Sequence, residues 1–235
     1  HIIAFDNDDK KMEKFLLAYK QQYPMYKIEP VAISLKVPYE IRNIHRDYWN
    51  PIARMASGNI VMATGNDSLI QTKHYDRIIS DAVAAHVNKY QHDLCQILVD
   101  DGLRDSEHTD NYHDRIKFLE NNGGQQFCSW IIITKTATHV FEGLCPAEIT
   151  FSGADVVVYK SFNNSIITSQ IDLRDKVSID HVSHYTKKDM EADEVQLNHP
   201  REMAYNPHQL IHKYKNRIDS IILHQIKQNS QVSSI

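Results

Sequence analysis

This chain of 235 residues has few cysteines and no long apolar runs. Its three cysteines, Cys95, Cys128 and Cys145, are scattered and form no CxxC pair. We therefore expect neither a disulfide framework nor a cysteine-based zinc site, and the composition fits a reducing, cytoplasmic compartment. The longest apolar runs, such as residues 130–133 and 156–159, are far too short to span a bilayer. We also expect no secretory signal, because no basic-then-apolar leader is visible.

Several function classes are disfavoured by what else is missing. The formal net charge is −4, so the chain lacks the basic surplus of a broad nucleic-acid binder. Segments of the GxSxG, HExxH, Walker or GxGxxG type are absent, which removes the commonest hydrolase, zinc-protease and nucleotide-loop interpretations. With 42% hydrophobic residues, the chain is not wholly disordered. The unusual abundance is of histidine, with fourteen residues.

Strand-like and helix-like patterns alternate along the sequence. The β-rich runs lie at residues 1–5, 26–35, 59–64 and 94–99, and helical periodicity lies at 10–23, 47–55, 72–90 and 207–228. Asp47 and Thr72 stand where helix caps are expected. This alternation predicts a mostly parallel central sheet with helices on both faces, followed by a C-terminal helix.

Acidic residues follow three of the predicted strands. They lie at residues 6–9, at 65–67 and at 100–101. Ligands of open α/β sheets bind at the carboxyl ends of the strands. The coincidence of acids with these ends indicates a polyanion that is held through a metal ion.

Residues 49–67, WNPIARMASGNIVMATGND, resemble the central signature of GT-A glycosyltransferases of the family-two-like group. There an Asn begins a helix, a small residue and a Gly close it, and a strand delivers an acidic motif of the DxD type. Here Asn66-Asp67 stands in place of the usual pair of acids. Residues 72–79, TKHYDRII, are similar to the family's next helix.

The likeness extends to both sides of this signature. Residues 5–9, FDNDD, look like the acidic end of the family's second strand, so the expected first strand is missing. Residues 128–143, 146–149 and 153–156 are similar to the acceptor half. The resemblance implies a GT-A-like fold in a single domain, residues 1–235. Its nucleotide-sugar-binding half would be 1–100, its acceptor half 101–200, and its C-terminal helix and tail 201–235.

The resemblance implies a site for Mn²⁺ or Mg²⁺ beside the donor diphosphate. Asp67 would hold the ion, Asn66 would be a neutral ligand or a supporting group, and a histidine would complete the shell. That histidine is either His181 or His184, since residues three apart on a strand point to opposite faces. A hard divalent cation stabilises the charge that builds on a diphosphate leaving group.

Further donor contacts are implied around the acidic turn and the helix start. Asp6 would accept a hydrogen bond from the nucleotide base, and Asp8 or Asp9 would face the ribose. Arg46 and Asn50 would meet the base or the diphosphate. Each has a structural alternative, because acids after a strand also cap the following helix, and Arg46 and Asn50 also suit a helix start.

Two carboxylates compete for the role of general base. An inverting transfer needs a base that takes a proton from the acceptor hydroxyl as it attacks the anomeric carbon. Asp155, at the opening of a predicted helix, is one candidate, and Glu148 is the other. The sequence does not choose between them.

The resulting hypothesis is a glycosyltransferase with a nucleotide-sugar donor, most simply a UDP-sugar, and an acceptor hydroxyl. The acceptor would be a saccharide, a protein side chain or a modified DNA base. Two alternatives stay open. One is a nucleotidyltransferase, which would need a Gly-rich basic phosphate loop, and the other is a degenerate GT-A module that binds a nucleotide or saccharide without turnover.

Overall fold

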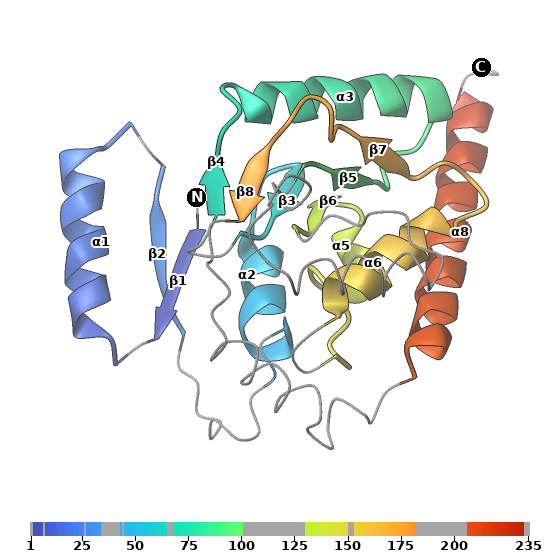
Figure 1. Cartoon of the computed structure of the whole chain (residues 1–235). Helices are drawn as coiled ribbons and strands as arrows, with labels where there is room; N and C mark the ends of the chain where they lie inside the picture. The colour runs from blue at the N-terminus through green and yellow to red at the C-terminus, as the bar shows by residue number, and fades with distance from the viewer. Residues whose placement is uncertain are drawn as a thin grey trace, which may run out of the picture.

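The computed structural model of the chain describes residues 2–6, 8–25, 27–33, 43, 45–64, 68–100, 130–149, 153–181 and 206–232. The strands are β1 (Ile2–Asp6), β2 (Glu29–Ile33), β3 (Ile60–Met62), β4 (Ser68–Ile70), β5 (Gln96–Leu98), β6 (Ile132–Thr134), β7 (Gln170–Asp172) and β8 (Ile179–His181). The α-helices are α1 (Lys10–Gln22), α2 (Asn50–Met55), α3 (Tyr75–Tyr90), α5 (Thr138–Phe141), α6 (Ala154–Asn163) and α8 (Pro207–Val232). A π-helical turn, His45–Trp49, leads into α2. The expected mixture of helices and strands with a C-terminal helix is confirmed (Figure 1).

The central sheet has four strands in the order β3-β6-β5-β7. β6 pairs antiparallel with β3 and with β5, and β5 pairs parallel with β7. Consequently β3, β5 and β7 run in one direction, and β6 runs between two of them in the other. For the described strands, the prediction of a mostly parallel sheet is therefore wrong in its pairings. An apolar run on a strand that is buried on both faces carries no information about strand direction.

Helices cover both faces of this sheet, as predicted. Successive residues of β6 point to opposite faces. Ile133 belongs to a core cluster that includes Ile218 and Ile222 of α8, whereas Ile132 belongs to a second cluster that includes Ile79 of α3. Figure 1 shows α3 on one side of the sheet and α5 and α6 on the other.

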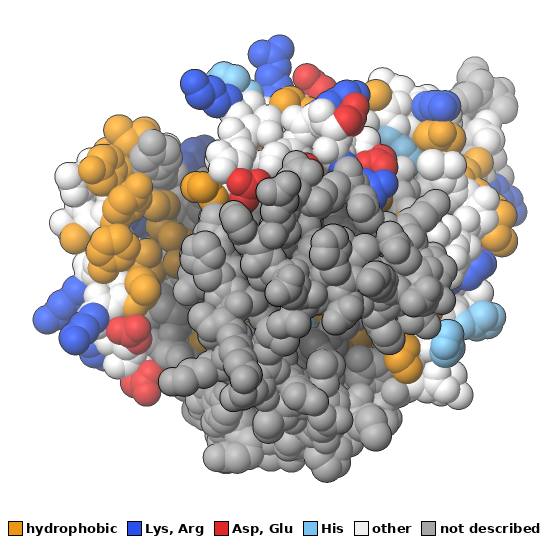
Figure 2. Space-filling model, viewed as in Figure 1, with side chains coloured by type: hydrophobic (Ala, Val, Ile, Leu, Met, Phe, Trp, Pro, Cys, Tyr) orange, Lys and Arg blue, Asp and Glu red, His pale blue; other side chains and the backbone are white. Residues whose placement is uncertain are grey.

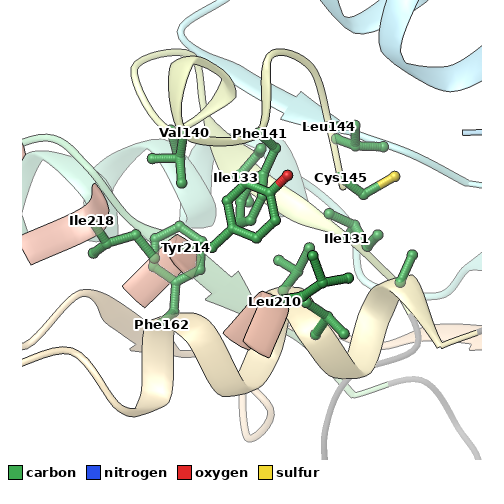
Figure 3. Packing of buried hydrophobic residues seen from close by; sticks show 14 of the residues in the cluster. Ile131, Ile133, Val140, Phe141, Leu144, Cys145, Phe162, Leu210, Tyr214 and Ile218 are labelled. Carbon is green, nitrogen blue, oxygen red and sulfur yellow. The ribbon is translucent and has the colours of Figure 1, made fainter. Parts of the chain in front are cut away.

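Three aromatic rings join the helices of the larger cluster (Figure 3). The ring centroid of Phe141 in α5 lies 6.1 Å from that of Phe162 in α6 and 4.9 Å from that of Tyr214 in α8. The C-terminal helix is therefore part of the core. It continues to Val232, beyond its predicted end. No helix within the described ranges has both the length and the apolar character needed to cross a membrane.

β1, α1 and β2 form an N-terminal unit that, among the described strands, shares no ladder with the central sheet (Figure 1). β1 and β2 pair in parallel, and α1 connects them. Leu16 is the only buried residue of α1, whereas Phe15 and Leu17 are 60% and 50% exposed. Figure 2 shows hydrophobic side chains gathered on the surface of this unit.

β4 and β8 form a small antiparallel ladder beside the central sheet. Thr72, between β4 and α3, does not cap the helix as predicted. Its hydroxyl accepts a hydrogen bond from the backbone N–H of Ser178 at 2.8 Å. The helix instead begins at Tyr75, after His74 in a left-handed conformation with φ 57°. The hydroxyl of Thr72, which the local pattern predicts to be a helix cap, instead binds the segment that leads into β8.

Candidate metal and donor site

The carboxyl ends of β3, β5 and β7 lie at one edge of the central sheet, because these strands run in the same direction. Asp100 follows β5 at this edge and bridges to Ser178. The backbone N–H of Asp100 donates to the carbonyl of Val177, and the N–H of Ile179 donates to the carbonyl of Asp100, both at 2.8 Å. This bridge fixes the start of β8 at the edge where ligands of open α/β sheets bind.

β8 then leads from this edge to the beginning of β4. In the β4–β8 ladder, the Cα of His181 is the partner of the Cα of Ser68. Directly opposed Cα atoms of an antiparallel ladder lie about 4.5–5.5 Å apart. Ser68 is the residue after Asp67 in the sequence. The ladder therefore pairs His181 with the residue that follows, in the sequence, the position predicted to hold the metal.

Buried and polar contacts hold this part of β8 in place. The indole N–H of Trp130 donates to the carbonyl of Ile179 at 2.7 Å, and Trp130 is itself buried. The carboxylate of Asp180 accepts from the hydroxyl of Ser178 at 2.9 Å and from the amide of Gln71 at 2.7 Å. A strand that is fixed by its neighbours on both sides is a suitable support for a ligand-binding residue.

Part of the predicted metal set lies outside the described residues. This applies to Asn66, Asp67 and His184 and to the side chain of His181. Their roles as metal ligands stay predictions.

The acidic turn after β1 is partly explained by helix capping. Asp9 is the N-cap of α1, because its carboxylate accepts from the backbone N–H of Met12 at 3.0 Å. Asp8 is exposed. Asp6 ends β1 and pairs with Ile33, and its side chain lies outside the described residues. The proposed contacts of Asp6 with the base and of Asp8 with the ribose stay predictions.

Arg46 lies in the π-helical turn and forms an ion pair with its neighbour Asp47. Its Nε donates to Oδ1 of Asp47 at 2.7 Å. This hydrogen bond raises the pKa of Arg46 and lowers the pKa of Asp47. The helix begins before Asp47, which does not cap it as predicted. Instead the side chain of Asn43 accepts from the N–H of Arg46 at 2.8 Å, and Asp47 accepts from the N–H of Asn43 at 2.9 Å.

Asn50 is buried, and its side chain fixes the loop after α5. Its Oδ1 accepts from the N–H of Leu144 at 2.8 Å and of Cys145 at 3.2 Å. Its Nδ2 donates to the carbonyl of Cys145 at 2.9 Å. Asn50 is only 2% exposed and supports this loop, and its contact with the base or the diphosphate stays a prediction.

Asp155 lies in the first turn of α6, as the sequence predicts. The chain enters this helix through Gly153 at φ 83°, a left-handed conformation that glycine adopts without strain. Burial and the negative charge of Asp155 raise the pKa of the Cys145 thiol. Ala154, the residue before Asp155, belongs to the same core cluster as Leu144 and Cys145 of the loop that Asn50 holds. The catalytic role of Asp155 stays a prediction.

The side chain of Glu148 forms hydrogen bonds with two residues of α8. Its carboxylate accepts from Lys213 Nζ at 2.6 Å and from the hydroxyl of Tyr214 at 2.7 Å. Burial alone would raise the pKa of Glu148, but the hydrogen bonds from Lys213 and Tyr214 outweigh it and lower the pKa. A carboxylate with a lowered pKa is a weaker base. The roles of Glu148 and Asp155 as alternative general bases stay predictions.

One cluster of metal-ligating side chains was missed by the sequence reasoning. His86, His92 and Cys95 meet in the interior, within the part of the chain that the structure describes. A signal for it existed, because His86 falls on the apolar face of α3, in line with Ile79 and Val83. Cys95 is not part of a CxxC pair, so the sequence did not indicate it as a metal ligand.

Comparison with known proteins identifies no relative: no protein-family model matches the chain, and no match to a curated protein or to a solved structure was found. The functional argument therefore depends on the residues and on their placement.

Proposed function

We propose that the chain is a GT-A-like glycosyltransferase that moves a sugar from a UDP-sugar to an acceptor hydroxyl with the help of Mn²⁺ or Mg²⁺. The observation that carries the proposal is the pairing of His181 with Ser68, the residue next to Asp67. It unites two segments that are far apart in the sequence and that the resemblance independently assigned to one metal site. β8 connects this pair to the carboxyl edge of the central sheet, where Asp100 bridges to Ser178.

In this proposal Asp67 and one of His181 or His184 hold the ion, and Asn66 supports them. The bound ion would supply positive charge to the departing diphosphate. Asp6 and Asp8 would orient the nucleoside, and Arg46 would exchange its ion pair with Asp47 for a phosphate oxygen.

Asp155 is the proposed general base. It would take the proton of the acceptor hydroxyl while the hydroxyl oxygen attacks the anomeric carbon and the bond to the UDP oxygen breaks. Such a displacement inverts the anomeric configuration. Asn50 contributes indirectly, because it fixes the Leu144–Cys145 backbone near Asp155. A product with retained configuration would exclude this mechanism.

The test is a thermal-shift screen of nucleotide sugars with and without Mn²⁺. A donor at about 100 times its Kd should stabilise the chain by about 2.7 kcal/mol. We expect a manganese-dependent shift with one donor, accompanied by release of UDP when the acceptor is supplied. Asp67→Ala should abolish the shift. Asp81→Ala, which removes an exposed acid of α3, should leave it unchanged.

Other outcomes would redirect or refute the proposal. A donor-dependent shift without any UDP release would favour the non-catalytic binding module. A shift that ignores Mn²⁺ and persists in Asp67→Ala would exclude the metal role of Asp67. No shift with any nucleotide sugar would contradict the glycosyltransferase itself.

A further inference from the structure

His86, His92 and Cys95 bring two imidazoles and one thiol together in the interior. Their potential ligand atoms all lie within 4.8 Å of one another. The exposed fractions are 6% for His86, 1% for His92 and 0% for Cys95. The cluster lies at the amino end of β5, whereas the candidate donor site lies at the carboxyl edge, so the two sites are separate.

The end of α3 creates this arrangement. The helix finishes at Tyr90, and Gln91 follows in a left-handed conformation with φ 61°. The chain thereby reverses, and the ring of His92 meets the ring of His86 edge-on, with centroids 4.9 Å apart. Three residues later Cys95 leads into β5.

The loop that carries His92 and Cys95 is anchored on both sides. Asp93 accepts from the hydroxyl of Thr136 at 2.6 Å and from the amide of Gln225 at 2.7 Å. The backbone N–H of Cys95 donates to the hydroxyl of Thr134 at 3.1 Å. The positions of the two ligand residues are therefore set by contacts with β6, with the turn that follows it and with α8.

Two ring nitrogens of the cluster are buried and lack a hydrogen-bond partner in the described part of the chain: Nε2 of His86 and Nδ1 of His92. The other nitrogen of His92 lies 3.1 Å from the carbonyl of Thr168. A carbonyl accepts only, so we assign the proton of His92 to Nε2, which leaves a lone pair on Nδ1. A backbone carbonyl that orients a histidine in this way is the usual support of a metal-binding imidazole.

The surroundings lower the pKa of both imidazoles. Burial, followed by the charges of His92 and Lys89, lowers the pKa of His86 to about 4. Burial also lowers the pKa of His92. Unpartnered buried polar atoms are rare in folded proteins and costly, and a bound cation removes that cost.

We propose that His86, His92 and Cys95 form a zinc site that ties the end of α3 to the start of β5. In a tetrahedral site with Zn–N of about 2.0–2.1 Å and Zn–S of about 2.3 Å, ligand atoms lie roughly 3.3–3.6 Å apart. Separations of up to 4.8 Å therefore need to contract by at most about 1.5 Å to reach this geometry. Two nitrogens and one sulfur suit a borderline-soft ion, whereas Mg²⁺ and Mn²⁺ prefer oxygen ligands.

The site would stabilise the fold and take no part in chemistry on a substrate. All three ligands are buried, so a substrate cannot reach the ion. A catalytic cysteine is equally disfavoured, because burial raises the pKa of the Cys95 thiol and a reactive cysteine needs an accessible thiolate. The fourth coordination position would belong to a water molecule. The proposal does not depend on the glycosyltransferase function.

The experiment removes metal from the full chain with a chelator and then adds Zn²⁺, or Co²⁺ as a spectroscopic probe. One equivalent of Co²⁺ should give a thiolate-to-cobalt charge-transfer band and tetrahedral d–d bands. Zn²⁺ at about 100 times its Kd should raise the Tm by roughly 5–10 °C. Cys95→Ser should remove the charge-transfer band and weaken zinc binding by about 100-fold or more.

Cys145→Ser is the matched control, because Cys145 is equally buried and lies outside the cluster. It should retain the cobalt spectrum, as should Asp67→Ala, which separates this site from the proposed donor metal. Equal loss of the band in Cys145→Ser would overturn the assignment. If Cys95→Ser does not fold, the unaltered chain still decides: a cobalt spectrum without a thiolate band, or no zinc-dependent rise in Tm, refutes the site.

Discussion

At the scale of single residues, Gly143 shows how tightly the loop beside Asp155 is built. A Cβ at Gly143 would overlap the Cβ and Cγ of Asn50. Asn50 has no room to yield, because three hydrogen bonds to Leu144 and Cys145 hold its amide. We therefore expect Gly143→Ala to lower the free energy of unfolding by about 1–3 kcal/mol, as measured by urea denaturation.

Gly58→Ala is the matched control for this prediction. At Gly58 the nearest atom to an added Cβ is the carbonyl oxygen of Ile60 at 3.5 Å, an ordinary van der Waals contact. The substitution should be neutral or slightly stabilising, by about 0.4–1 kcal/mol, since it restricts the unfolded chain. Equal stability of the two variants would show that the Asn50 contact is not tight.

Single residues also show which parts of the candidate site could be predicted. The placement of Asp155 at a helix start follows from local sequence, because Gly153 and the apolar run after it mark the boundary. The burial of Asn50 does not, because its partners are 94 and 95 positions away. The pairing of His181 with Ser68 is long-range as well, and only the family resemblance joined these segments beforehand.

At the scale of elements, Asp219 links α8 to the turn before β7. Its carboxylate accepts from the hydroxyl of Ser165 at 2.7 Å, from the N–H of Ile166 at 2.9 Å and from Lys215 at 2.5 Å. Burial alone would raise the pKa of Asp219, but these bonds outweigh it and lower the pKa. Asp219→Asn should therefore reduce the free energy of unfolding at pH 7 by about 1–3 kcal/mol.

The pH dependence of this contribution has a definite sign. A carboxyl group with a lowered pKa in the folded state stabilises the fold above its unfolded pKa of about 3.9. The contribution is lost as the pH falls through the lower, folded value. The stability difference between the original chain and Asp219→Asn should thus shrink on acidification below about pH 4. A difference that stays constant down to pH 2 would contradict the charged role of Asp219.

Glu148→Gln provides a comparison, because Glu148 also binds residues of α8. The Glu148 carboxylate is more exposed than that of Asp219, with 37% against 9% of the side-chain surface accessible. Solvent screens an exposed ion pair, so its loss should cost no more than about 1 kcal/mol. If the proposed glycosyltransferase function holds, the variant also checks the choice of base, because Glu148→Gln should retain the activity and Asp155→Asn should lose it.

The bounds of an element could be predicted where apolar residues recur along one of its faces. α1 and the start of α8 lie within a residue of their expected bounds, since their periodicity reflects burial on one side. The antiparallel insertion of β6 was not predictable, because its residues are buried on both faces and show no alternation. The prediction of a helix cap is wrong where a distant residue binds the capping side chain, as Ser178 binds the hydroxyl of Thr72.

At the scale of the whole molecule, the N-terminal unit and the central sheet differ in how much of their apolar surface is buried. α1 has one buried residue, Leu16, and packs on β2, which pairs with β1. β6, by contrast, is buried along its whole length. Stability within a protein varies with such burial, and regions with few apolar contacts open first. We therefore expect the N-terminal unit to unfold locally while the central sheet stays folded.

Two adjacent leucines of α1 test this expectation. Leu16 is 3% exposed and Leu17 is 50% exposed, so truncation of the first removes buried contacts and truncation of the second does not. In Leu16→Ala, the amides of α1 should exchange with deuterium about 100-fold faster, which corresponds to a loss of roughly 2.7 kcal/mol within the unit. The amides of β5 and β6 should keep their rates, and Leu17→Ala should change neither region. If Leu16→Ala accelerates the exchange of β5 and β6 by the same factor, the N-terminal unit and the sheet unfold together, and the chain is one cooperative domain.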